Sequence, residues 1–197
     1  MQVFRGFEEP IPLSHPVVAI GSFDGVHLGH RRILHFLTTY AHEHAVPSAV
    51  VTFDPHPQQL LRPDSDFFVI NSLTRNLQLI EAEGVDAAVV IPFTRVFSQL
   101  SYMEFVRQYL MDGLHVGCLV MGPNHAMGHN RAGNHDLLKR FCESHGIEVL
   151  EIPELMLHEA GVHSSKIRQA IREGDEALAS ELLGYPYTIE QKRISNE

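Results

Sequence analysis

The sequence contains little cysteine, no tryptophan and fewer basic than acidic residues. Its 197 residues include two cysteines, and 15 lysines and arginines stand against 24 aspartates and glutamates, for a formal net charge of −9. Cys118 and Cys142 lack the spacing of a zinc site, so we predict buried free thiols. A negatively charged surface repels nucleic acid, which is therefore not an expected partner. Any phosphate ligand must be held locally, by backbone N–H groups and a few cations.

Long apolar runs are also absent. No uninterrupted run is long enough to cross a bilayer, and the first residues are interrupted by Arg5, Glu8, Glu9 and Pro10. A membrane-spanning helix is therefore not expected. We predict a cytoplasmic protein with no membrane partner.

The length and composition are typical of a single folded domain. Hydrophobic residues make up 44% of the chain and charged residues 20%, without a low-complexity stretch. We expect this domain to span residues 1–187, followed by a polar C-terminal tail over residues 188–197. The sequence does not determine whether the protein is a monomer or a homo-oligomer.

Short apolar runs alternate with amphipathic stretches along the chain. Apolar runs of four to six residues between helical patterns are typical of parallel strands that are buried on both faces. The sequence therefore predicts an α/β fold, a Rossmann-like open parallel sheet with helices on both faces. The expected strands are 17–20, 48–53, 87–91, 118–121 and 148–152, and the expected helices are 30–44, 73–83, 102–110, 135–145, 164–172 and 175–183.

The strongest local signal is a glycine-rich segment, residues 20–30, that follows the first expected strand and opens the first expected helix. Its glycines allow the backbone to approach a ligand closely. The helix behind them directs free N–H groups and the positive end of its dipole outward, which suits a phosphate. Contacts with a nucleotide are expected from Gly21, Ser22, Phe23, Asp24 and Gly29.

Two histidines of the same segment, His27 and His30, are three residues apart. They would lie on the same side of the first helical turn and could donate hydrogen bonds to phosphate oxygens. Splitting ATP between its α- and β-phosphates depends on such charge stabilisation more than on a covalent nucleophile. Two other interpretations remain open: a tight turn whose histidines only cap or pack, and a metal site formed by Asp24, His27 and His30.

A second polar segment, residues 162–168, begins a late helix. Ser164 and Ser165 can cap the helix and also bind an anion. Lys166 and Arg168 place positive charge near a helix N-terminus, against the dipole, unless an anion lies between them. Phosphate binding is one explanation, and a plain serine cap with solvated basic neighbours is the alternative.

Two further loops follow expected strands. The first, residues 51–57, is made rigid by prolines and is either a wall for a flat aromatic ligand or only a stiff turn. The second, residues 122–133, is polar and glycine-bearing, in a position where loops often bind ligands, although an ordinary surface loop would look similar. The residues that we expect to contact a ligand in these loops are Pro55, His56, Pro57, Asn124 and Arg131.

The segment Gly21-Ser22-Phe23-Asp24-Gly25-Val26-His27-Leu28-Gly29-His30 resembles the signature of the FMN adenylyltransferase module of bacterial bifunctional riboflavin kinase/FAD synthetases, in the His-x-Gly-His nucleotidyltransferase superfamily. The resemblance covers almost the whole chain and implies the nucleotidyltransferase fold. It also implies that ATP, accompanied by Mg2+, and FMN react to give FAD and pyrophosphate. Further landmarks of the module are found, in order, at residues 52–57, 92–94, 97–106, 131–133 and 183–187.

The resemblance implies roles for individual residues. The two histidines and the hydroxyl-rich helix start bind the ATP phosphates in this family, and the arginine would counter the charge of pyrophosphate. The Asp-Pro-His-Pro loop and the Pro-Phe-Thr segment are expected to shape the flavin side. The catalytic residues implied in this chain are His27, His30, Ser164, Ser165 and Arg168.

The sequence departs from the family pattern at three places. His163 and Ser165 stand where the family usually has Ser and Thr, and residues 124–128 replace a typical Asp-Phe-x-Phe-Gly pattern. The chain also ends where the riboflavin kinase domain of the family begins, which implies an enzyme of one reaction. Transfer to another phosphorylated acceptor, and a catalytically silent module that binds flavin or nucleotide, are the alternative functions.

Overall fold

The computed structural model describes residues 1–122, 135–157 and 160–188. Within these residues, six parallel strands form one sheet in the order β1-β4-β3-β2-β5-β6. This arrangement confirms the predicted Rossmann-like sheet. The strands are β1 (Gln2–Arg5), β2 (Val17–Ile20), β3 (Ser48–Asp54), β4 (Ala87–Pro92), β5 (Cys118–Met121) and β6 (Glu148–Glu151).

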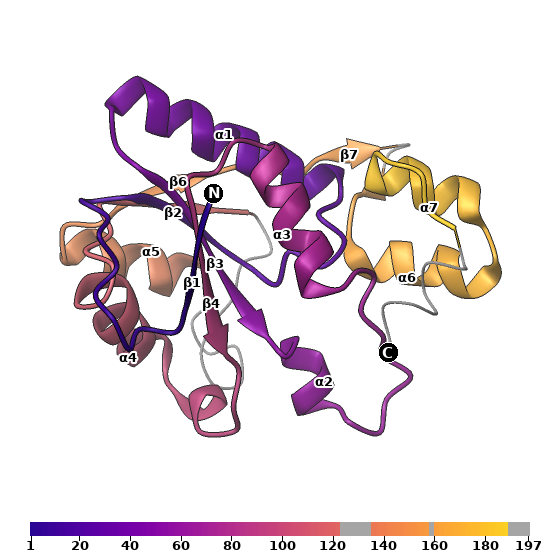
Figure 1. The fold of residues 1–197 in the computed structure, drawn as a ribbon, viewed down its shortest axis with the longest axis horizontal. Helices are drawn as coiled ribbons and strands as arrows, with labels where there is room; N and C mark the ends of the chain where they lie inside the picture. The colour runs from indigo at the N-terminus through magenta and orange to yellow at the C-terminus, as the bar shows by residue number, and fades with distance from the viewer. Residues whose placement is uncertain (123–134, 158–159, 189–197) are drawn as a thin grey trace.

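Helices cover both faces of the sheet (Figure 1). Successive side chains of a strand point to opposite faces, so Val17 and Ala19 of β2 pack on the side of α1 and α3, whereas Val18 and Ile20 face the other side. This alternation in every inner strand explains why these strands are continuous apolar runs. The covering elements are α1 (Leu28–His44) and α3 (Leu73–Ala82) on one face, and α4 (Tyr102–Phe105), η2 (Val106–Met111) and α5 (His135–Ser144) on the other.

The chain changes direction across the sheet at β2. It runs from β2 through β3 to β4 on one side and then returns to place β5 and β6 on the other. The carboxyl ends of β2 and β5 therefore flank the topological switch point, where ligands of open α/β sheets usually bind.

A pair of C-terminal helices, α6 (Ser164–Glu173) and α7 (Glu176–Leu183), extends the molecule beside the sheet (Figure 1). Its own apolar cluster includes Ile167 and Leu183 and reaches Ile70 in the loop before α3. A short antiparallel pair, β7 (Met156–Leu157) and β8 (Ala160–Gly161), leads into α6. The N-terminus of α6 meets that of α1 at Gly29, where an added Cβ would lie 3.2 Å from the Val162 carbonyl oxygen.

The structure adds elements that the sequence pattern did not predict. These are β1 at the sheet edge, α2 (Pro57–Leu61), the 3-10 turn η1 (Phe97–Gln99) and the β7–β8 pair. The predicted helix over residues 102–110 is divided into α4 and the π-helix η2. All of these elements are short or exposed, so their apolar periodicity is weak.

Two smaller predictions can also be compared with the structure. Cys118 and Cys142 are free and buried, as predicted. None of the helices in the described ranges combines the length and apolar character that crossing a bilayer requires. Residues 189–197 of the predicted tail lie outside the described residues.

Candidate active site

A pocket of about 290 Å3 opens at the carboxyl ends of β2, β5 and β6, at the switch point of the sheet. One wall is formed by the glycine-rich segment and the first turns of α1. The opposite wall is formed by the segment after β6 and the start of α6. Predicted residues that line the pocket are Gly21, Phe23, His27, Gly29, His30 and Ser164.

His27 is the N-cap residue of α1 and is buried. Its Nδ1 accepts a hydrogen bond from the backbone N–H of His30 at 3.3 Å. An acceptor nitrogen carries no proton, so the proton of the neutral ring lies on Nε2. Burial lowers the pKa of His27 to about 3, and the charges of His163 and Arg168 act in the same direction. His27 is therefore a neutral hydrogen-bond donor at neutral pH.

His30 stacks on His27, with ring centroids 3.7 Å apart and an angle of 17° between the planes. Burial lowers the pKa of His30 well below its ordinary value, with smaller effects from His27 and Arg168. Its Nδ1 is buried and has no hydrogen-bond partner among the described residues. Burying an unpaired N–H is costly, so the ring proton of His30 is also best placed on Nε2. The pair can thus offer two N–H groups to an anion.

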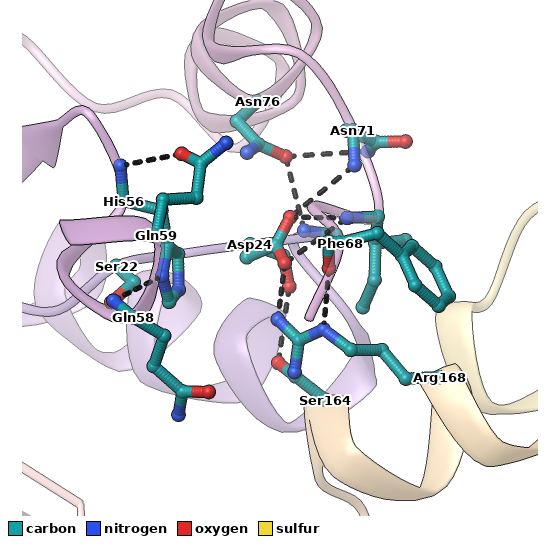
Figure 2. Close-up of polar contacts among 12 residues, drawn as sticks. Ser22, Asp24, His56, Gln58, Gln59, Phe68, Asn71, Asn76, Ser164 and Arg168 are labelled. Carbon is teal, nitrogen blue, oxygen red and sulfur yellow. Dashed lines mark hydrogen bonds and ion pairs between the residues drawn. The ribbon is translucent and has the colours of Figure 1, made fainter. Parts of the chain in front are cut away.

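Asp24 and Arg168 form a buried ion pair (Figure 2). The Asp24 carboxylate also accepts hydrogen bonds from the backbone N–H groups of Ile70 at 2.9 Å and Asn71 at 3.3 Å. Arg168 Nε donates to the Phe68 carbonyl oxygen at 2.8 Å. Burial raises the pKa of Asp24, and the Arg168 charge and the backbone N–H groups oppose that rise. The pair joins the loop after β2, the segment before α3, and α6.

These contacts differ from those predicted for Asp24 and Arg168. Arg168 is 7% exposed and its guanidinium is engaged by protein groups, so it is not placed as an open phosphate ligand. The Asp24 carboxylate likewise faces Arg168, which corrects the metal interpretation of Asp24 with His27 and His30. In the described part of the chain, no cluster of three or more histidine, cysteine or acidic side chains could hold a metal ion.

A second set of contacts clamps the glycine-rich loop at Gly25. The Tyr185 hydroxyl donates to the Gly25 carbonyl oxygen at 2.6 Å and accepts from Asn71 Nδ2 at 2.8 Å. The Gly25 N–H donates to Asn76 Oδ1 at 3.1 Å, and Ser164 Oγ donates to the Asp24 carbonyl oxygen at 3.1 Å. The sequence marked Tyr185 only as a family landmark and did not mark the two asparagines. The sequence offered one sign of their role, which is that both amide side chains lie at the start of the expected helix over residues 73–83.

His56 has a structural role at the end of β3. Its Nδ1 accepts from the Gln58 backbone N–H at 3.1 Å, and Gln59 completes a capping box for α2. Its ring packs on Phe67 at 4.7 Å, and the same phenyl ring lies 4.3 Å from the Arg168 guanidinium carbon. Burial, helped by the Arg168 charge, lowers the pKa of His56 to about 4.

The other predicted residues do not line the pocket or cannot be placed. Ser165 is exposed on the first turn of α6. The Ser22 carbonyl oxygen accepts a hydrogen bond from Thr52 Oγ1 at 3.3 Å. Predicted residues that do not line this pocket are Ser22, Asp24, Pro55, His56, Pro57, Ser165 and Arg168, and those that lie outside the described residues are Asn124 and Arg131.

Sequence comparison identifies related proteins. Residues 11–166 match the protein family described as FAD synthetase. The bifunctional riboflavin kinase/FMN adenylyltransferase of Pseudomonas fluorescens is 36% identical over 190 residues, which are 96% of this chain and 61% of that protein. The chain thus spans about three fifths of the length of such relatives.

Two solved structures resemble the fold. A crystal structure described as a macrolide-efflux protein from Streptococcus pneumoniae has a TM-score of 0.83 and 27% sequence identity, with coverage of 94% of this chain and 61% of that one. The pantothenate synthetase of Thermus thermophilus has a TM-score of 0.55 and 15% identity, with coverage of 93% of this chain and 81% of that one. The second similarity concerns the fold alone.

Proposed function

The chain belongs to the FAD synthetase family, and on that basis we propose that it transfers the adenylyl group of ATP to FMN, with release of pyrophosphate. The observation that carries the proposal is the stacked pair of neutral histidines, His27 and His30, at the N-terminus of α1 beside the switch-point pocket. Both rings have an Nε2–H to offer to phosphate oxygens. Helix N-termini and such donors are the groups that bind a polyphosphate.

In the proposed reaction, a phosphate oxygen of FMN attacks the α-phosphorus of ATP in line with the departing pyrophosphate. The new P–O bond forms as the bond to the β-phosphate oxygen breaks. A phosphomonoester is largely ionised near neutral pH, so no general base is needed. His27 and His30 donate hydrogen bonds to the oxygens on which negative charge increases, and these bonds strengthen in the transition state.

The remaining residues support this arrangement. Ser164 lines the pocket next to His27 and is the α6 hydroxyl that we assign to the phosphates. Ser165, one residue further, is assigned to the part of the polyphosphate that extends from the pocket. Arg168 is reassigned from a pyrophosphate contact to a positioning residue that fixes the loop through Asp24.

Mg2+ is proposed to enter with ATP, since this ion usually binds substrate phosphates and water rather than a cage of protein groups. It supplies charge neutralisation of the polyphosphate.

The direct test is to incubate the purified protein with ATP, Mg2+ and FMN, resolve FAD by chromatography and quantify pyrophosphate in parallel. We expect FAD and pyrophosphate in equal amounts, and neither product when FMN is omitted. ATP binding without either product would support the silent binding module instead. Pyrophosphate release with a pantetheine phosphate but not with FMN would identify a different acceptor, which the altered loop at residues 124–128 makes worth testing.

A further inference from the structure

An ion pair that the proposed mechanism does not use lies in the wall of the pocket. His163 Nε2 is 2.7 Å from Glu154 Oε1, and both residues line the pocket with His27 and Ser164. Glu154 precedes β7, and His163 is the N-cap residue of α6. The β7–β8 pair brings these two positions together, and the Val162 N–H donates to the Leu155 carbonyl oxygen at 3.1 Å between them.

Gly161 shows that the fold makes room for this pair. A Cβ at this position would lie 2.3 Å from Glu154 Oε1 and 2.7 Å from His163 Nε2. These distances are too short for any side chain unless the pair moves. The ion pair is therefore packed against the bare backbone of Gly161 at the pocket wall.

The chemistry of the pair is suited to binding a phosphate in the pocket. The His163 side chain makes no cap hydrogen bond to α6, so its Nδ1 is not used by the helix that it begins. The contact with the Glu154 carboxylate uses the other ring nitrogen, Nε2, at 2.7 Å. A lone carboxylate would repel a polyphosphate, whereas a carboxylate paired with an imidazolium leaves the second N–H of the ring free to bind one.

We propose that His163, held by Glu154, is an additional ATP-binding residue that donates a charged hydrogen bond from Nδ1 to the β- or γ-phosphate. The inference rests on the proposed function for the identity of the nucleotide. It adds a cation to a site whose other two histidines are neutral. Arg168, whose charge is already neutralised by Asp24, then supports the loop and is not a ligand of the phosphates.

The experiment is a calorimetric titration of the chain with ATP and with AMP, both with Mg2+, at pH 6.5. In His163→Ser, which restores the residue usual in the family, we expect ATP affinity at pH 6.5 to fall about tenfold or more, as for loss of a charged hydrogen bond. AMP affinity should change less than about twofold, because AMP lacks the outer phosphates. His42→Ser, at an exposed site near the end of α1, is the matched control.

Glu154→Gln tests the partner. It should leave AMP affinity unchanged and lower ATP affinity less than His163→Ser does, because the ring remains but loses the carboxylate that orients it. Equal loss of ATP and AMP affinity in Glu154→Gln would overturn the proposal, because the carboxylate would then bind the sugar or base. Unchanged ATP affinity in His163→Ser with a lower melting temperature would also overturn it. The ion pair would then have a structural role only. If wild-type protein binds ATP through His163 but makes no FAD, the proposed function fails and this inference stands.

Discussion

Two polar pairs join the loop after β2 to neighbouring helices, and they are satisfied in different ways: Asp24 pairs with Arg168 of α6, and His27 stacks on His30 of α1. Asp24 and Arg168 are bound to each other and to three backbone groups (Figure 2). His27 and His30 are stacked, and His30 Nδ1 has no partner among the described residues. A pair whose hydrogen bonds are internal contributes to the architecture of the loop. A pair that leaves a buried ring nitrogen unpaired beside a pocket costs stability, which is typical of a functional site.

We expect the largest loss of stability when the Asp24–Arg168 pair is broken. Asp24→Ala leaves the Arg168 guanidinium buried without its counter-charge, so the free energy of unfolding should fall by about 3–5 kcal/mol. Chemical denaturation would measure this loss. The control is Asp66→Ala, which removes the ion pair between Arg172 and the Asp66 side chain, 82% exposed, and should cost at most about 1 kcal/mol. Equal losses in the two variants would contradict a structural role for Asp24.

The histidine pair should show the opposite behaviour. His30→Ala should lower the rate of FAD formation by about 10²–10³, as expected for loss of one donor that acts in the transition state. Its loss of unfolding free energy should be smaller than that of Asp24→Ala, since Nδ1 gives up no hydrogen bond. Rate assays and denaturation of the same preparation test both statements. An unchanged rate would remove His30 from the mechanism.

Acid should weaken the folded state through the buried His27 and the half-buried His56. The pKa of His27 is about 3 and that of His56 is about 4 in the folded protein, below the ordinary 6.5. A depressed histidine pKa means that the unfolded chain binds the proton first, so stability is complete above pH 6.5 and is lost as pH falls below it. His27 alone should cost about 3 kcal/mol by pH 4.5. Denaturation at a series of pH values measures this loss.

A histidine variant sharpens the acid prediction. His27→Gln keeps a polar side chain but cannot gain the proton, so the slope of unfolding free energy against pH between 6.5 and 4.5 should become smaller. Wild-type stability that stays constant or rises over this range would contradict the assignment of neutral buried histidines.

The smallest expected effect is at the clamp on Gly25. Tyr185→Phe removes the hydroxyl that bridges the Gly25 carbonyl oxygen and Asn71, so unfolding free energy should fall by about 1–2 kcal/mol. The rate of FAD formation should also fall, because the loop that carries the histidines is less well held. Tyr187→Phe is the matched control. Its hydroxyl is buried and has no hydrogen-bond partner within the described ranges, so its removal should change neither quantity.

Local pattern was sufficient to predict most of the sheet. The strands at residues 17–20 and 118–121 were predicted to the residue, because strands buried on both faces are continuous apolar runs with sharp ends. The strand β1, with a mostly exposed pattern at the sheet edge, was missed because its residues do not have that signature.

The pocket was predicted in part. Glycine spacing and a helix start placed His27, His30 and Ser164 near a phosphate, and all three line the same pocket. The sequence also marked Arg168 as a phosphate ligand, because an arginine near a helix N-terminus suggests an anion. It could not show that the anion is Asp24, which lies 144 residues earlier in the chain.

The sequence by itself determined the succession of the inner strands and the main helices along the chain, the glycine-rich turn and the histidines at its end. These follow from local periodicity and backbone preference. Only the tertiary structure decided which charge pairs with which, where the proton of each histidine lies, and that Glu154 and His163 meet across Gly161. Such choices depend on contacts between distant segments and on the burial that these contacts create. Local sequence pattern contains information on neither the contacts nor the burial.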